Sequence, residues 1–303
     1  MGLESGGRRD RGSTFEGITR YLLAAVALPS ALAAAAQTVT VRYANDYFAA
    51  TDYYFTQGIY VGVDAERWGV FAGQEGFTPT ELSDPDVRPL DRPYAGTFYL
   101  GARARRGAWT YDGLVGLIGP AALGEEQQVG IHRAIEDEIP QGWRHQIRNG
   151  LLLDVGLGFR QNLQRRPHFA ADLDAGARLG TFRTRLSAGG EVRAGWPWLA
   201  AFASAHVYVP LYDASLQGTL FGRASPHEFA FADVRHLVAR ARLGFRARFG
   251  PRVTFVYTRT FATREFAGAR RHAWGAVGVQ VLAKARRRAS MVAHAYTEDF
   301  RPW

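Results

Sequence analysis

The sequence predicts an all-β protein, a transmembrane up-and-down antiparallel β-barrel of about twelve strands. Apolar side chains alternate with polar or small ones along many segments of about ten residues or longer, which is the period of a β-strand. The N-terminus has the layout of an export signal. No apolar run approaches the roughly 18 residues that a membrane-spanning helix needs, so strands are the elements expected to cross the membrane.

The export signal is predicted over residues 1–36. Four arginines between positions 8 and 20 precede the apolar run 21–28, and the small-residue run 31–36 offers A-x-A cleavage sites. This order is typical of a secretory signal peptide, and we expect cleavage near Ala36. A retained amphipathic anchor is the less favoured alternative.

The alternation is clearest between Leu237 and Phe249. There Leu, Ala and Phe side chains alternate with Val238, Gly244 and four arginines. In a membrane barrel the apolar side chains face lipid, and the arginines and acids face the lumen. The same reading predicts strands at 38–48, 54–66, 67–77, 95–106, 107–118, 149–163, 165–178, 181–194, 199–212, 233–249, 251–263 and 271–283.

Connection lengths predict the organisation of this barrel. Short connections alternate with long ones at 78–94, 119–148 and 213–232, as an up-and-down topology requires. Because bacterial barrels place their longer loops outside the cell, we expect all long loops at the cell-surface rim. Residues 37–283 are interpreted as one domain, and 284–303 as a basic C-terminal tail.

Composition excludes several classes of function. The chain has no cysteine, which rules out disulfides, zinc–thiolate sites and a cysteine nucleophile. Its formal net charge is +9. The sequence nevertheless has no lysine-rich run with interleaved aromatic residues, the pattern that binds along a phosphate backbone. We therefore expect no nucleic-acid partner, and a membrane environment instead.

The long loop 119–148 is predicted to carry a helix. Residues 125–135 are good helix formers without proline. Gln128 and His132 are four residues apart, so they lie on one helical face, and Glu138 follows. Loops near thirty residues are unusual between strands and are more often functional than accidental.

Polar residues from three further stretches map to the same rim. They are Asn45-Asp46, the run from Thr51 to Gly58 that contains Thr56, and the run from Asp91 to Gly96. Taken singly, Asn-Asp is ordinary turn chemistry, and Asp91-Arg92-Pro93 is typical of a fixed loop entry. Their combination with His132 at one membrane interface points to a site.

The sequence resembles the outer-membrane lipid A 3′-O-deacylases of the LpxR type. The resemblance spans essentially the whole chain after the signal peptide. It is carried by 44–46 (AND), 51–58 (TDYYFTQG), 91–96 (DRPYAG), Gly119-Pro120, Gln128-x-x-x-His132-Arg133, Glu138, Gly142-Trp143, Gln146-Ile147, 258–260 (TRT) and 264–266 (REF).

This resemblance implies a twelve-stranded barrel with Ca²⁺-dependent esterase activity on lipid A of lipopolysaccharide. It implies a site between the barrel wall and the loop helix, at positions that match Asn45, Asp46, Thr56, Gln128, His132 and Glu138. Some members also use a Lys-Arg pair in the second outer loop. Here residues 82–88 read LSDPDVR, which leaves phosphate contacts at that loop in question.

The residue types suit ester hydrolysis on chemical grounds. Such a reaction needs a base and a partner for the charge that develops on the carbonyl oxygen. His132 is the expected base, and a carboxylate such as Glu138 would orient its ring. Oxygens of Asp46 and Asn45 suit Ca²⁺. No G-x-S-x-G motif supports a serine nucleophile.

Two alternatives remain at this stage. One is a barrel without catalysis, either a porin or a structural barrel that binds lipopolysaccharide. The large inward side chains argue against an open pore and favour ion pairs inside. The other is a phospholipase of the serine–histidine type, which the missing serine motif disfavours.

Strand parity tests whether the site faces lipid. Asn45 shares a face with Val41, whereas Thr56 falls on the face of Gly58 and Tyr60, opposite Ile59. A lipid-facing groove against the loop helix therefore requires a β-bulge between Tyr54 and Gly58, and bulges are common at barrel rims.

Overall fold

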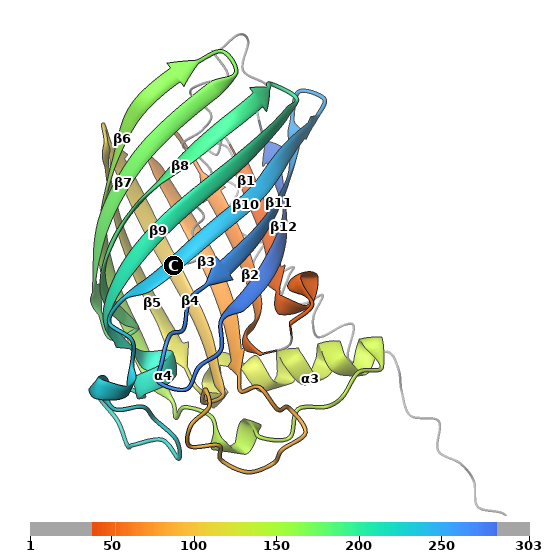
Figure 1. Ribbon diagram of the computed structural model, residues 1–303, viewed down its shortest axis with the longest axis vertical. Coiled ribbons are helices and arrows are strands. Elements are labelled where there is room, and N and C mark those ends of the chain that lie inside the picture. The colour runs from red at the N-terminus through yellow and green to blue at the C-terminus, as the bar shows by residue number, and fades with distance from the viewer. Residues whose placement is uncertain (1–37, 52, 284–303) are drawn as a thin grey trace, which may run out of the picture.

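The computed structural model describes residues 38–51 and 53–283. The predicted signal peptide and basic tail lie outside the described residues. Twelve antiparallel strands form a closed barrel in which each strand pairs with its neighbours in sequence, and β1 pairs with β12 (Figure 1). The predicted fold is confirmed. The strands are β1 (Thr38–Asn45), β2 (Tyr54–Asp64), β3 (Trp68–Thr78), β4 (Ala95–Arg106), β5 (Trp109–Ile118), β6 (Gly150–Arg166), β7 (Phe169–Gly180), β8 (Arg183–Trp196), β9 (Leu199–Asp213), β10 (Val238–Phe249), β11 (Val253–Ala262) and β12 (His272–Leu282).

Four strand ends differ from those expected by three residues or more: the start of β7 lies at Phe169 because β6 continues to Arg166, and the ends of β1, β6 and β10 each have a local reason. β1 ends at Asn45, because that side chain accepts the Tyr47 N–H at 2.7 Å and starts the 3-10 helix η1 (Asp46–Ala49). β6 extends to Arg166 through a register shift between Asn162 and Gln164, which disrupts the period of two. β10 begins at Val238, because residues 231–233 form the short helix η4 (Phe231–Asp233).

The long connections lie at one end of the barrel, as expected (Figure 1). They carry η1, η2 (Pro120–Ala122), α3 (Gly124–Ile135), η3 (Trp143–His145), α4 (Ala214–Gln217) and η4. The opposite end has short turns only, such as residues 65–67 between β2 and β3. None of the helices in the described part of the chain has the length and apolar character needed to cross a membrane.

The outer wall is apolar. Leu151, Leu153 and Val155 alternate along β6 with inward residues, and each remains about half exposed or more. Exposed tryptophans (Trp196 and Trp198) mark the short-turn end. An apolar band flanked by aromatic residues is the surface of a membrane-embedded barrel.

Ion pairs fill the lumen, as expected for the inward arginines. The carboxylate of Glu75 accepts from the hydroxyls of Tyr60 and Tyr99, at 3.2 Å each, and from Arg183 Nη2 at 2.9 Å. Further pairs lie along the barrel interior. They join Asp64 to Arg103 and Arg105, Arg178 to Asp112 and Asp154, Arg193 to Asp172 and Glu191, and His206 to Asp174.

A second network closes the lumen at the long-loop end. Arg92 is buried, donates to Glu265 Oε2 at 2.8 Å and to Ser215 Oγ at 2.7 Å, and lies over the ring of Phe77. Burial alone would raise the pKa of the Glu265 carboxyl, but Arg92 and Arg240 outweigh it and hold this pKa well below its usual range. The stability that this carboxylate contributes is therefore retained at neutral pH and lost only in acid.

Replacing Arg183 by methionine should destabilise the barrel by about 3–5 kcal/mol, because Glu75 would be left charged, buried and without its cation. Urea unfolding in detergent micelles, followed by heat-modifiable gel mobility, measures this change. The double variant Glu75→Gln/Arg183→Met removes both charges and should recover part of the loss. A single variant as stable as the wild type would contradict the role assigned to this pair.

Candidate active site

The long loop between β5 and β6 is fastened to the barrel at several points. The Gly119 N–H donates to Gly96 O at 2.9 Å, and the Ile147 N–H donates to Tyr94 O at 2.8 Å. The Gln141 N–H donates to Leu82 O at 2.9 Å, which ties this loop to the loop before β4. The start of α3 consequently lies against β4, and the helix contacts β3 and β4 at the long-loop rim (Figure 1).

Two glycines allow the start of α3 to touch the wall. A Cβ placed on Gly124 would lie 2.7 Å from the Cα of Gly96, and one placed on Gly96 would lie 2.9 Å from the Gly124 backbone. Both distances are shorter than van der Waals contact allows, so the backbones approach closely only because neither residue has a side chain. This contact sets how far α3 stands from β4.

The bulge expected in β2 is present. The register with β3 shifts between Phe55 and Gln57, so Thr56 is the extra residue. Phe55 consequently points inward, where it packs against Phe77 and Trp274. A Cβ on Gly76 would lie 3.3 Å from the Thr56 methyl and 3.1 Å from the Gln57 side chain. The bulge therefore puts Thr56 and Gln57 together on the outer face, which resolves the conflict in parity.

A directed chain of hydrogen bonds joins α3 to this face. Trp143 Nε1–H donates to Gln128 Oε1 at 2.8 Å, and Gln128 Nε2 donates to Thr56 Oγ1 at 3.3 Å. All three residues are almost fully buried. The indole can only donate, so it fixes the orientation of the Gln128 amide. Since the Thr56 oxygen already accepts from Gln128, its hydroxyl proton can be donated to another group.

A second amide contact was not expected from the sequence. Gln57 Nε2 donates to Gln127 Oε1 at 2.8 Å, and Gln57 is the register partner of Asn45 across β1 and β2. Asn45, Gln57 and α3 therefore share one region of the outer wall. Once the bulge is placed, the period of two along β2 predicts that Gln57 lies on the same face as Asn45. The hydrogen bond with Gln127 depends on where α3 packs on the barrel, so neighbouring residues in the sequence do not predict it.

Asn45 and Asp46 organise the turn that follows β1. The Asn45 amide donates to the Tyr43 hydroxyl at 3.0 Å while its oxygen caps η1. Asp46 is 1% exposed, and its Oδ2 accepts the Tyr53 N–H at 2.7 Å. η1 contacts β12 and β2, so the outer face of β2 lies between η1 and α3. Both side chains thus accept backbone N–H groups of the turn, and the turn lies at the edge of the same wall.

His132 lies one helical turn beyond Gln128 and is 7% exposed. Its Nδ1 lies 2.5 Å from the backbone carbonyl oxygen of Glu138. A carbonyl can only accept, so Nδ1 carries the proton and Nε2 is left as the acceptor of the neutral ring.

The expectation for Glu138 is corrected in one respect. Its backbone carbonyl, rather than its carboxylate, orients the His132 ring, and the Glu138 side chain is exposed. The physical reason lies in the end of α3. Glu136 adopts a left-handed conformation (φ 60°), which turns the chain back so that the following main chain faces the last turn of the helix.

The donor groups of the described residues bear on the expected metal site. Residues 38–51 and 53–283 hold no group of three or more His, Cys, Asp or Glu side chains arranged to bind a metal ion. The Asp46 carboxylate and the Asn45 amide are hard oxygen donors, the kind that Ca²⁺ takes. The donors fit Ca²⁺ in kind, and backbone, water or substrate oxygens would complete its usual six to eight ligands.

The Asp91-Arg92 stretch is a fixed loop entry. Asp91 Oδ2 accepts from the Thr80 N–H and hydroxyl, and His227 contacts the Asp91 carbonyl at 2.6 Å. In the loop before it, Asp86 pairs with Arg144 at 3.3 Å. These residues hold the outer loops together and lie in the cap over the lumen rather than beside α3.

A closed barrel with an apolar outer surface, a charged interior and long loops at one rim is an integral outer-membrane β-barrel. The family model described as outer membrane protein LpxR matches residues 60–210 and 196–282. The chain therefore belongs to the LpxR family of outer-membrane proteins. Gln128, His132 and Glu138 lie inside the matched ranges, whereas Asn45, Asp46 and Thr56 precede them.

A solved structure of similar fold supports the architecture. LpxR from Salmonella typhimurium is 18% identical, with 81% of this chain and 99% of that chain covered and a TM-score of 0.66. The translocator domain of autotransporter NalP from Neisseria meningitidis is 13% identical over 89% and 97% of the chains, with a TM-score of 0.41. The β domain of the Bordetella autotransporter BrkA is 11% identical over 82% and 99%, with a TM-score of 0.42. A comparison with curated proteins found no match.

Proposed function

We propose that this protein is a lipid A deacylase, an esterase that hydrolyses a 3′-acyloxyacyl ester of lipid A in the outer leaflet of the outer membrane. The observation that carries the proposal is the chain from Trp143 through Gln128 to Thr56. It fastens α3 to the outer face of β2, and the buried His132 follows Gln128 by one helical turn. Membership of the LpxR family supports the same assignment.

The outer wall suits a lipid substrate energetically. An acyl ester of lipid A lies beside the barrel near the headgroup boundary. Moving its chain into the lumen would cost about 0.8 kcal/mol for each CH₂ exposed to a polar environment. The lumen is also occupied by buried pairs such as Glu75–Arg183, which argues against the porin alternative. A site on the wall leaves the acyl chain in hydrocarbon.

The proposed reaction uses His132 as a general base. Its Nδ1 is held by the Glu138 carbonyl, so Nε2 takes a proton from water while the water oxygen attacks the ester carbonyl. The Thr56 hydroxyl donates to the oxygen on which negative charge develops, and Gln128 fixes that hydroxyl. When the carbon–oxygen ester bond breaks, the imidazolium returns the proton to the departing alkoxide, and the products are a fatty acid and an alcohol.

Ca²⁺ is part of the proposal. Asp46 would hold the ion, with Asn45 keeping the turn that presents it. When bound, the cation would supply positive charge that stabilises the developing oxyanion. We place the long-loop rim, and with it this site, at the cell surface.

Replacing His132 by alanine should lower deacylation of purified lipid A by about 10² to 10⁴, because the general base is lost. Mass spectrometry of lipid A measures released and retained acyl chains. His145→Ala is the matched control, since His145 lies in the same loop and contacts Arg144. The barrel of both variants should retain heat-modifiable mobility. Wild-type turnover in the His132 variant would make this histidine a bystander.

Chelation of Ca²⁺ should abolish activity, and added Ca²⁺ should restore it. Asp46→Asn keeps an oxygen to accept the Tyr53 N–H but removes the charge, so this variant should need a higher Ca²⁺ concentration for half-maximal rate. A titration of initial rate against free Ca²⁺ gives both results. Full activity in excess chelator would remove the metal from the mechanism.

The orientation can be measured on intact cells. A protease site inserted between Ser83 and Val87 should be cleaved from outside, because this loop lies at the long-loop rim. The same site inserted at Arg106-Gly107, in the turn between β4 and β5, should be protected. The opposite pattern would place the proposed site in the periplasm.

A further inference from the structure

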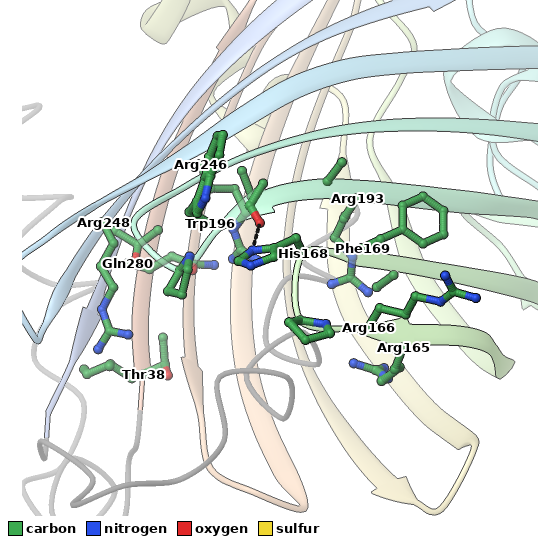
Figure 2. A pocket seen from close by; sticks show the side chains of 18 residues that line it. Thr38, Arg165, Arg166, His168, Phe169, Arg193, Trp196, Arg246, Arg248 and Gln280 are labelled. Carbon is green, nitrogen blue, oxygen red and sulfur yellow. Dashed lines mark hydrogen bonds between the residues drawn. The ribbon is translucent and has the colours of Figure 1, made fainter.

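The lumen opens into a cavity of about 200 Å³ at the short-turn end, opposite α3. The turns after β6 and β8 and the ends of β1, β10, β11 and β12 line it (Figure 2). Five arginines and one histidine contribute to the lining: Arg165, Arg166, Arg193, Arg246, Arg248 and His168. Within the described ranges 38–51 and 53–283, no Asp or Glu is among its lining residues.

Two carboxylates that contact the lining arginine Arg193 each serve more than one arginine. Asp172 pairs with Arg193 and lies 3.7 Å from Arg165. Glu191 lies 3.4 Å from Arg193 Nε and 4.0 Å from Arg242. These two acids are thus shared among several arginines, and the described lining itself contributes five arginines and no Asp or Glu.

Two of the lining arginines donate to neutral groups. Arg248 Nη2 donates to the carbonyl of Pro251 at 2.7 Å. Arg166 Nε donates at 2.6 Å to the Gln164 amide oxygen, in the amide orientation that satisfies both groups. These acceptors position the guanidinium groups without cancelling their charge.

The surroundings of the cavity place it near a membrane interface. Trp196 lines it and stacks on Trp198, with ring centroids 6.3 Å apart, and both are well exposed on the barrel surface. Aromatic girdles of this kind lie at headgroup level. His168 Nδ1 contacts Gly195 O at 3.1 Å, which fixes its ring at the cavity (Figure 2).

We propose that this cavity is an anion-binding site that takes a phosphate group, either from a phospholipid headgroup or from a free phosphate ester. Guanidinium groups match phosphate oxygens with paired hydrogen bonds and keep their charge at any physiological pH. Several strands present them, so the sheet holds them in place before a ligand arrives. The volume is several times the roughly 30 Å³ that one water occupies. The inference does not rest on the proposed function, because the two sites lie at opposite rims.

The test uses the full mature chain in an uncharged detergent. Isothermal titration with inorganic phosphate, at constant ionic strength in chloride, should show saturable binding. The variant Arg166→Gln/Arg248→Gln should bind phosphate at least about tenfold more weakly, because charge-assisted hydrogen bonds are lost. It leaves no carboxylate unpaired, since both arginines have neutral partners.

A matched control separates a built site from a diffuse field. Arg223→Gln/Arg235→Gln removes the same charge from exposed positions in the loop between β9 and β10, at the other rim. This variant should bind phosphate as the wild type does. Gel mobility confirms that both variants fold. Absence of saturable binding, or equal weakening in the two double variants, would overturn the proposal.

A second titration distinguishes the two sources of phosphate. Short-chain phosphatidylglycerol is added below its micelle concentration, to the wild type and to both double variants. Tighter binding than inorganic phosphate, lost in Arg166→Gln/Arg248→Gln, identifies a lipid headgroup as the ligand. Binding no tighter than that of inorganic phosphate, with the same dependence on the arginines, identifies a free phosphate ester.

Discussion

The pairing of buried charge in the lumen is the constraint on which the rest of the structure depends. Glu75, less than 2% exposed, must share its charge with Arg183 and its remaining lone pairs with two tyrosines. A buried carboxylate without such partners would cost several kcal/mol. The lumen is therefore filled by its own paired side chains and has no room for a lipid substrate. Chemistry on a lipid substrate has to be built outside, on the wall that faces the substrate.

A site on the outer wall requires polar groups on an apolar surface. In this protein those groups are buried between the wall and helix α3. Gln128 and His132 lie on one face of α3 and are each less than a tenth exposed, and Trp143 closes the region of Gln128 from the end of the loop. A buried hydrogen bond in low dielectric is strong when complete and costly when broken. The chain from Trp143 to Thr56 is complete, so it both fastens the helix and orders the donors.

The motifs that carried the family resemblance divide into two groups. In one group Thr56 contacts Gln128 on the outer wall, and His132 follows one helical turn later on α3. The other, with Arg92 and Glu265, meets in the cap over the lumen, where the two residues pair at 2.8 Å. The sequence motifs alone do not separate these two groups, because holding the outer loops together and taking part in a reaction can each require a particular side chain.

The fold was predictable from the sequence because alternation is a local property. β10 alternates arginine with alanine, leucine and phenylalanine, and its inward and outward faces follow directly. The ends of β6 and β1 were not predictable, because a register shift and a cap replace the ladder there. The four-residue spacing of Gln128 and His132 predicted their common face.

The partner of each site residue was harder to predict. The position of α3 depends on contact between Gly96 and Gly124, which are far apart in sequence. The pairing of Gln57 with Gln127 follows from that position and from no nearby residue. The choice of the Glu138 carbonyl over its carboxylate depends on the backbone conformation at Glu136, which residue type alone does not determine.

The bulge at Thr56 has a wider consequence. A single inserted residue reverses which side of the sheet the end of β2 presents, yet the strand number and the pairing below it stay unchanged. The insertion or deletion of one residue at the rim end of a strand is thus enough to move two neighbouring polar side chains between the lumen and the outer surface of a barrel. Membrane barrels that share an architecture can therefore acquire or discard a surface site without redesigning the wall that carries it.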